Sequence, residues 1–383
     1  MRKRFLVGAV MLGMAALGML PASGQAGERT VVIGLAAPMS GLSGSTGISL
    51  EHAAQLAIDD LNETPPVIGG DKITFKLLPQ DDRADPRTGE LIAEYLVKSK
   101  VAAVVGHWNS GVGIPASRIY AAAGIPHVSP AVTSPAYTQQ GFPTAFRIVP
   151  HDGDGARHTA EYVVREMKAR NIVVIDDRTV FGAGYAAEFK KSVAALNAKV
   201  VAHYTVSSKS STFNHILPAA RSLNPDVVFF AGIDAQAAQL VSELRRLQIT
   251  APLVGIGGMV GPTFLKLAGP AAEGTIVLEP GPPSYKGAQW TRFESAWKAR
   301  YKEDIYLYAP FAYDAVRTIA AAMRDANSVD TDKVTAELHK IRYRGITGAI
   351  SFDKDGNLRD PVFTLYEAKG GRWRVIKTIE DKS

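Results

Sequence analysis

The chain has 383 residues, of which 46% are hydrophobic and 21% charged, a globular balance whose length suits two domains. Its formal net charge of +6 is too small, and its basic residues are too dispersed, to favour nucleic acid or an anionic membrane surface as a partner. The sequence contains no cysteine, which excludes disulfides, thiolate metal sites and thiol nucleophiles.

The first 26 residues have the order of a secretory signal peptide. Arg2, Lys3 and Arg4 precede an uncharged, mostly apolar run over 5–20, and small residues then lead to Ala26. The run is shorter than the ~20 residues of a membrane-spanning helix. We therefore expect cleavage after Ala26 and a secreted, soluble mature protein.

From residue 30 onward, short β-branched runs alternate with helical patterns. The first series predicts strands over 30–37, 73–78, 101–106 and 125–129 and helices over 46–62, 86–99 and 112–123. A second series, after Pro150, predicts helices over 154–168, 184–196, 213–223 and 235–247 and strands over 172–176, 199–206, 226–232, 253–256 and 275–278. Such alternation is typical of parallel sheets covered on both faces, so two series predict two doubly wound α/β lobes.

The last hundred residues continue these lobes. They predict helices over 289–301, 309–326 and 332–339 and then strands over 346–352, 361–367 and 373–378. We expect the helices to return to the first lobe and the strands to complete the second. The predicted division is 27–148 with 280–347 for lobe 1 and 149–279 with 348–383 for lobe 2. The chain then crosses between the lobes three times, which predicts a three-stranded hinge.

The chain contains partial matches to enzyme motifs, but they do not lie at the positions relative to strands and helices that such motifs require. Residues 182–187 match a loose Gly-x-Gly-x-x-Ala dinucleotide pattern, but five residues separate it from the preceding strand and no acid follows in 199–206. Ser351 and Lys354 fit Ser-x-x-Lys at a strand end rather than at a helix start. No two histidines have the i, i+4 spacing of a zinc-binding helix. We therefore expect no catalysis, cofactor or metal.

Two loops at strand ends combine glycine and hydroxyl residues with helix starts. Loop 106–111 contains Trp108 and Ser110, and loop 129–134 contains Ala131 and Thr133. Ligands of open α/β sheets bind at the carboxyl ends of the strands, where free N–H groups of helices favour an anion. The pattern predicts a receptor for a small carboxylate, although N-capping alone also places serines at such positions.

Four short segments follow one another along the chain in an order and at a spacing that are specific in combination: Ala37-Pro38-Met39-Ser40-Gly41, Gln80-Asp81-Asp82, the run 129–135 and the run 231–236. Together they resemble the periplasmic solute-binding proteins of ABC importers for branched-chain amino acids, from end to end after residue 26. The resemblance implies a type I periplasmic binding fold, a periplasmic monomer, an amino acid or related solute, and permease subunits of the inner membrane as partners. It also implies a carboxylate site at Ser110, Ala131 and Thr133, with Phe181 pressing on the ligand from the second lobe.

Three pocket positions depart from the family pattern. By the resemblance, Ile233 replaces a ligand-contacting Tyr, Gly257 replaces the acid that pairs with the ligand's ammonium group, and Thr46 replaces an aromatic residue. A buried ammonium without a carboxylate costs several kcal/mol, against about 8 kcal/mol for micromolar binding. Either Asp234 supplies that carboxylate, or the solute is an aromatic or aliphatic acid without an ammonium group. A ligand-sensing receptor on the same fold also remains open.

Overall fold

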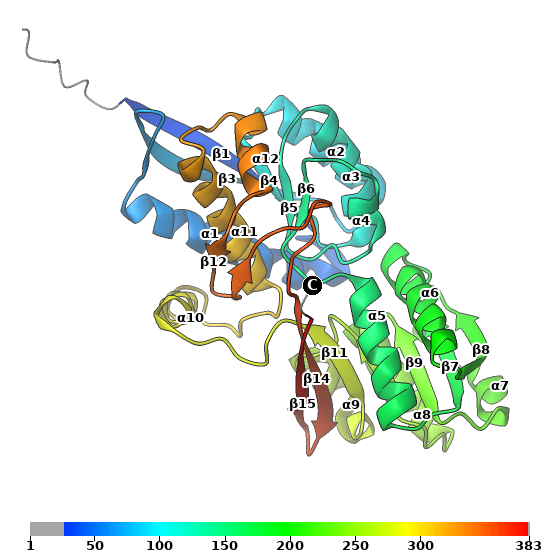
Figure 1. Cartoon of the computed structure of the whole chain (residues 1–383). Helices are drawn as coiled ribbons and strands as arrows, with labels where there is room; N and C mark the ends of the chain where they lie inside the picture. Colours follow the sequence, from blue (N-terminus) through cyan, green and yellow to red (C-terminus); the bar gives the residue numbers. More distant parts are fainter. Residues whose placement is uncertain (1–26, 382–383) are drawn as a thin grey trace, which may run out of the picture.

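The computed structural model describes residues 27–381 (Figure 1). The predicted signal peptide, residues 1–26, lies outside the described residues. Within residues 27–381, no helix combines the length and the apolar character needed to cross a bilayer.

The first lobe is built on a six-stranded sheet with the order β2-β3-β1-β4-β5-β6. Only the β2–β3 pair is antiparallel. The strands are β1 (Glu28–Ala37), β2 (Val67–Ile68), β3 (Asp71–Asp81), β4 (Ala103–Gly106), β5 (His127–Ser129) and β6 (Ala145–Arg147). The helices of this lobe are α1 (Gly44–Glu63), α2 (Pro86–Lys98), α3 (Ser110–Ala122), α4 (Ala136–Gln139), α10 (Ala288–Tyr301), α11 (Ala309–Asp325) and α12 (Thr331–Leu338).

Local chemistry explains where these elements begin and end. The Asp85 carboxylate accepts the Thr88 N–H at 2.8 Å and Pro86 occupies the first turn, which starts α2 as predicted. Gly106 ends β4 with φ 145°, and a Cβ at that position would lie 2.3 Å from the Ala36 carbonyl oxygen. Only glycine fits there, and the chain leaves the sheet toward α3.

The second lobe is built on a seven-stranded sheet with the order β15-β14-β11-β10-β9-β7-β8. The two final strands are antiparallel additions to a parallel sheet. The strands are β7 (Asn171–Asp176), β8 (Lys199–Thr205), β9 (Val227–Ala231), β10 (Leu253–Ile256), β11 (Ile276–Pro280), β14 (Val362–Lys369) and β15 (Arg372–Glu380). The helices are α5 (Asp152–Glu161), which continues as a π-helical turn, α6 (Val180–Ala195), α7 (Leu217–Ser222), α8 (Asp234–Arg246) and α9 (Pro262–Ala268).

The central strand β9 shows why this sheet is covered on both faces. Val228 and Phe230 are buried in one core cluster, and Val227 and Phe229 are buried in another. Successive side chains of a strand point to opposite faces, so an uninterrupted apolar run requires helices on each side. The predicted fold of two α/β lobes is confirmed.

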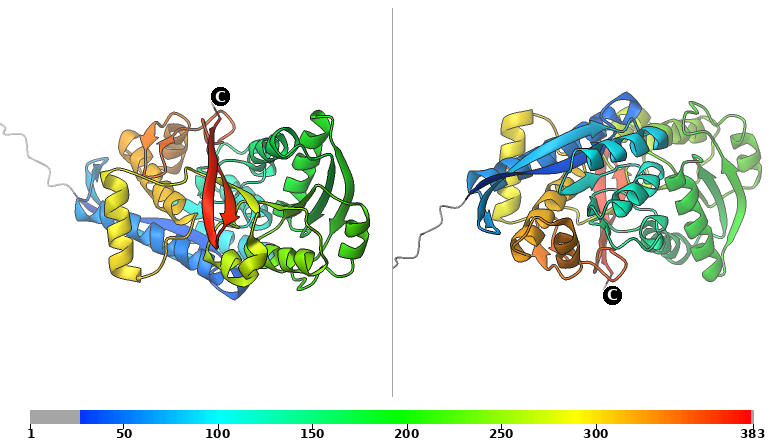
Figure 2. Two further views of the ribbon diagram at one scale, coloured as in Figure 1. Left: turned by 90° about the horizontal axis from the view of Figure 1, so that it is seen from below. Right: turned by 90° about the horizontal axis from the view of Figure 1, so that it is seen from above.

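Segments distant in the sequence share a core in the first lobe. The yellow and orange helices α10–α12 lie beside the blue N-terminal elements (Figure 2). Phe293 and Trp297 of α10 are buried in the same cluster as Leu50 and Ala54 of α1. Helices α10–α12 therefore share their core with the N-terminal elements of the first lobe.

The final crossing lies later than the predicted boundary at 348. The short strand β13 (Ala349–Ile350) pairs with β12 (Tyr343–Arg344), and Ile350 and Phe352 are buried in the first lobe's core. The Phe352 ring lies 5.0 Å from that of Phe146, and Gly356 accepts the Arg147 N–H at 2.9 Å. These contacts hold residues 349–356 on the first lobe, before β14 begins. The chain therefore crosses between the lobes near 148–151, 281–287 and 353–361.

Candidate functional site

A narrow cavity of about 20 Å³ lies between the lobes, at the crossing segments. Thr133 and Tyr308 face it from the first lobe. Its other walls come from the second lobe and the crossings: Pro150, His151, Asp152, Gly155, Phe181, Tyr185, Gly257, Leu278, Pro280 and Phe363. The predicted residues Thr133, Phe181 and Gly257 are therefore brought together from three elements that are far apart in the sequence.

The two predicted carboxylate loops lie side by side. They follow β4 and β5, which are parallel neighbours, so both emerge at the same edge of the sheet. Ser110, Ala131 and Thr133 are all buried, and the Ser110 Oγ accepts the Ser134 N–H at 3.4 Å. The start of α3 and the 129–134 loop therefore offer their hydroxyl and N–H groups in one place.

Ser129 fixes the geometry of these loops. Its hydroxyl donates to the His107 carbonyl at 3.2 Å and accepts the N–H groups of Val132 at 2.9 Å and Ala131 at 3.3 Å. Behind it, the buried His107 Nδ1 lies 2.6 Å from an Asp82 carboxylate oxygen. The network joins both loops to the core, so their donors are positioned by the protein itself.

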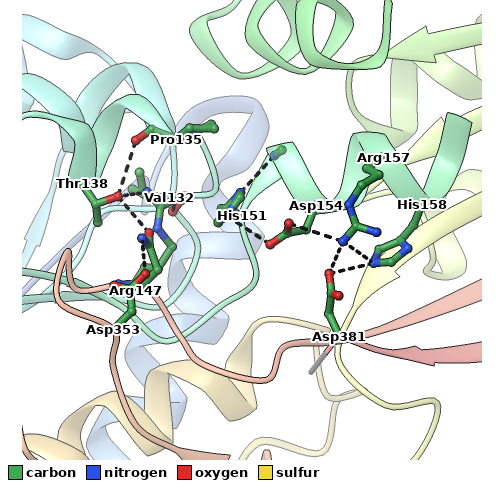
Figure 3. Close-up of polar contacts among 12 residues, drawn as sticks. Val132, Pro135, Thr138, Arg147, His151, Asp154, Arg157, His158, Asp353 and Asp381 are labelled. Atoms are coloured by element: carbon green, nitrogen blue, oxygen red, sulfur yellow. Dashed lines mark hydrogen bonds and ion pairs between the residues drawn. The ribbon is translucent and has the colours of Figure 1, made fainter. Parts of the chain in front are cut away.

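A buried arginine lies behind the second loop (Figure 3). The Arg147 guanidinium donates from Nη1 to the Val132 carbonyl at 3.0 Å and from Nη2 to the Thr138 hydroxyl at 2.9 Å. Burial lowers the pKa of Arg147 to about 10, which leaves the group charged at neutral pH. Its fixed positive charge favours an anion at the adjacent loop.

Asp152 is a cavity residue that the sequence reasoning missed. It is the first residue of α5 and is 3% exposed; its N–H donates to the Thr133 carbonyl at 2.9 Å. The Thr133 hydroxyl bonds to its carboxylate, whose Oδ2 is buried without a partner among residues 27–381. Burial raises the pKa of Asp152 to about 7. The available sequence signal was an acid directly after the Pro150 crossing, at a helix start.

The start of α5 is also held from its other side (Figure 3). His151 Nε2 lies 3.1 Å from an Asp154 carboxylate oxygen. Arg157 and His158 both contact the carboxylate of Asp381, which follows β15. These contacts join α5 to the edge of the second sheet at β15. They therefore fix the position of α5 and of its first residue, Asp152.

A second acid, Glu279 of β11, is fully buried next to the cavity wall. Its Oε1 accepts the N–H groups of Gly258 at 3.1 Å, Met259 at 2.9 Å and Val260 at 2.7 Å. Burial raises the pKa of Glu279 to about 8, while these N–H groups act in the opposite direction. The sequence reasoning missed this residue because it ended the strand at 278, whereas β11 extends to Pro280 and carries Glu279.

Phe181 occupies the first turn of α6, facing the first lobe. The Thr179 hydroxyl accepts the Gly182 N–H at 2.9 Å and starts the helix two residues before the ring. The Phe181 ring is partly buried, 6.1 Å from that of Tyr185, and both line the cavity. Across the gap, a Cβ on Gly111 of α3 would lie 3.3 Å from Val180. The helix starts of α3 and α6 thus approach each other closely.

Ser110 and Ala131 belong to the carboxylate loops but do not line this cavity, and the remaining predicted residues also lie outside its wall. Thr46 and Trp108 both hydrogen-bond to the Tyr306 hydroxyl, and the Tyr306 ring lies 5.8 Å from that of Tyr308 in the wall. Ile233 and Asp234 lie at the start of α8. The Asp234 carboxylate accepts the Ala235 N–H at 2.7 Å and bonds to Thr263. The Asp234 carboxylate is therefore bonded within the second lobe, at the start of α8.

Comparisons with known proteins agree with this architecture. The family model described as "Periplasmic binding protein" matches residues 30–372, and the chain belongs to this family. Within this family, it is similar to binding proteins of the branched-chain amino acid type. It is 28% identical over 357 residues to Leu/Ile/Val-binding protein homolog 1 of Brucella suis biovar 1, covering 93% of this chain and 95% of the relative.

Two solved structures show the same fold. The branched-chain amino acid transporter substrate binding protein LivJ from Streptococcus pneumoniae, in complex with isoleucine, is 26% identical, with TM-score 0.82 and coverage of 93% of this chain and 100% of that chain. An ABC transporter solute binding protein from R. palustris, in complex with benzoate, is 21% identical, with TM-score 0.81 and coverage of 93% and 98%. The members of this family are solute-binding proteins, not enzymes.

Proposed function

We propose that this protein captures a small carboxylate-bearing solute, an amino acid or a related acid, between its lobes and delivers it to the permease of an ABC importer. The observation that carries this proposal is the cavity between the lobes, where the carboxylate loops of the first lobe lie opposite Phe181 of the second. The isoleucine held by the similar LivJ protein supports the amino acid class.

The binding step follows from the two halves of the site. The solute carboxylate accepts hydrogen bonds from the Ser110 hydroxyl, the Ala131 N–H and Thr133, with the charge of Arg147 behind them. Phe181, Leu278 and Phe363 cover its apolar part, at about 25 cal/mol for each Å² removed from water. The ligand favours the closed form by the contacts it gains there, so second-lobe residues determine closure.

The proposed cellular setting follows the family. Periplasmic binding proteins work outside the inner membrane, and the predicted signal peptide supplies the export step. We expect a monomer that binds no nucleic acid, leaves its solute chemically unchanged and contacts permease subunits in the closed form. A sensory partner in place of a permease would use the same solute site.

A specific observation favours a second solute class, aromatic or aliphatic acids without an ammonium group. Gly257 carries no carboxylate where the family pattern has one, and much of the cavity wall is apolar. The benzoate complex shows that this fold can enclose an aromatic acid. In this alternative the carboxylate loops keep their role and the second lobe provides only apolar contacts.

A ligand screen tests the proposal. The purified protein is heated with each of the twenty standard amino acids and with the matching acids that lack the amino group, and hits are measured by isothermal titration calorimetry. A ligand at a hundred times its Kd stabilises the folded state by about 2.7 kcal/mol, so we expect a clear rise in Tm. If none of these carboxylates raises the Tm, the proposed function is wrong.

A further inference from the structure

Because Gly257 has no side chain, a small space remains in the cavity wall between Gly257, Tyr308, Pro280 and Glu279; we call this space the corner at Gly257. A Cβ at Gly257 would lie 2.9 Å from the Tyr308 Oη, 3.4 Å from the Pro280 Cδ and 3.5 Å from the Glu279 Oε2. In the sheet, Ile256 is paired with Leu278, so residues 257 and 279 follow at neighbouring positions of parallel strands. The glycine therefore brings the carboxylate of the adjacent strand within reach of the corner.

The two oxygens of Glu279 are not equivalent. Oε1 accepts three backbone N–H groups, whereas Oε2 accepts only that of Gly258, at 2.9 Å. A carboxylate oxygen has room for about two hydrogen bonds, so Oε2 can accept one more. Oε2 is also the oxygen next to the corner at Gly257. The free capacity of the carboxylate is thus directed toward the solute cavity.

A second buried acid faces the same cavity without a partner for one oxygen. Asp152 lines the wall, and its Oδ2 is buried and unbonded within residues 27–381. In that part of the chain neither Asp152 nor Glu279 forms an ion pair with Lys, Arg or His within 4.0 Å. Both carboxylates lie close enough to Tyr308 to affect its hydroxyl. Two buried acids without an ion-pair partner at one cavity can give up their protons to a cation that lies between them.

We propose that Glu279 replaces the acid missing at position 257 and binds the ammonium group of an amino acid through the corner left by Gly257. The inference rests on the proposed function and narrows the solute to the amino acid class. The solute carboxylate lies on the Ser110 and Thr133 loops, while its ammonium group donates to Glu279, to Asp152 and to the Tyr308 hydroxyl. Position 257 then lacks the acid of the family pattern, but the site keeps a negative charge because Glu279 supplies it.

The structural role of Glu279 has to be separated from this binding role. Its Oε1 anchors the loop 258–260, and a variant that merely loosens this loop weakens every ligand equally. Glu279→Gln is suited to the test because its amide oxygen still accepts the three N–H groups and only the charge and one bond at Oε2 are lost. Gly257→Ala fills the corner and leaves Glu279 unchanged.

The experiment compares each amino acid that binds with the acid that lacks only its amino group, for example leucine with 4-methylpentanoate and phenylalanine with 3-phenylpropanoate. We expect the wild-type protein to bind the amino acid at least tenfold more tightly. In Glu279→Gln this preference falls at least tenfold, while the Kd of the deamino acid changes less than threefold. Gly257→Ala lowers the same preference, and Asp226→Asn, an acid of the second lobe that neither lines the cavity nor faces Glu279, leaves it unchanged.

A second measurement follows proton release. Burial raises the pKa of Glu279 to about 8, so the group holds a proton in the ligand-free protein at pH 7 and loses it to make room for an ammonium partner. The other titratable groups that interact with it are Asp234, Tyr185, Tyr306, Tyr308 and Tyr366. The calorimetric enthalpy of amino acid binding therefore differs between phosphate and imidazole buffers in the wild type, and less in Glu279→Gln.

The outcomes separate the two proposals. If deamino acids bind as tightly as amino acids, or if Glu279→Gln weakens both members of a pair equally, the role of Glu279 is wrong and the carboxylate site stands. If only acids without an ammonium group bind, the inference fails and the alternative solute class is correct. If no carboxylate of either kind binds, the proposed function itself fails.

Discussion

Replacing Phe181 by alanine tests whether the second lobe contacts the solute. Full burial of a phenylalanine side chain is worth about 1.5–3 kcal/mol. The Phe181 ring is already partly buried beside Tyr185, so a bound solute removes at most about a third of its area from water. This leaves about 0.5–1 kcal/mol for the contact, equivalent to a roughly two- to fivefold weaker Kd in Phe181→Ala.

The assay is titration calorimetry with the ligand found in the screen. Phe181→Leu keeps part of the apolar contact, so its Kd should lie between those of the wild type and Phe181→Ala. Phe142 offers a matched control because it is a partly buried phenylalanine of the first lobe that does not line the cavity. Phe142→Ala should leave the Kd unchanged. A Phe181→Ala protein that binds within twofold of the wild type would refute the assignment of this ring to the site.

Three further predictions follow from the same geometry. Thr133→Val removes a hydroxyl from the carboxylate site and should weaken every carboxylate ligand about two- to tenfold, since the hydroxyl turns from Asp152 to the solute and the net gain of such an exchange is about 0.5–1.5 kcal/mol; equal Kd values in calorimetry would contradict the site. Arg147→Met leaves the Val132 carbonyl without its donor and should lower the free energy of unfolding in urea by at least about 1–3 kcal/mol; a loss below about 0.5 kcal/mol would contradict the role of the guanidinium. Asp152 and Glu279, with pKa values of about 7 and about 8, bind protons in the folded state that the unfolded chain releases near 3.8 and 4.5. The stability of the ligand-free protein should therefore fall as pH rises from 4.5 to 7, by at most about 1.4 kcal/mol per pH unit and proton, and urea titrations of Glu279→Gln should show a smaller slope.

The fold could be predicted where elements are long enough to show a period. Strand β9 has an unbroken apolar run, and α2 has both its cap and its first-turn proline. The three-residue strand β6 and the short helices α4 and α9 were missed because such lengths show no period. Helix α7 starts at 217 rather than 213 because the buried Phe213 uses its N–H to bond Glu243. The position of Pro218 was a usable signal for that later start.

The strand and loop pattern alone predicted only Ser110, Thr133 and their neighbours, which follow adjacent strands of the first sheet, and the structure brings their loops together. Phe181 and Gly257 of the second lobe were predicted only through the resemblance, and both line the cavity. Asp152 and Tyr308 reach the cavity from a crossing segment and a helix placed by tertiary packing, which no local pattern reports. Glu279 depends on the register between β10 and β11, because it matters only beside a glycine on the neighbouring strand.

Neither lobe consists of one continuous stretch of chain. The core of the first lobe is complete only when α10–α12 have joined it. In the second sheet, the edge of β11 stays exposed until residues 362–369 pair with it as β14. A chain leaving the ribosome therefore cannot finish either hydrophobic interior before nearly all of it has been synthesised. Such late, long-range pairing makes folding slow.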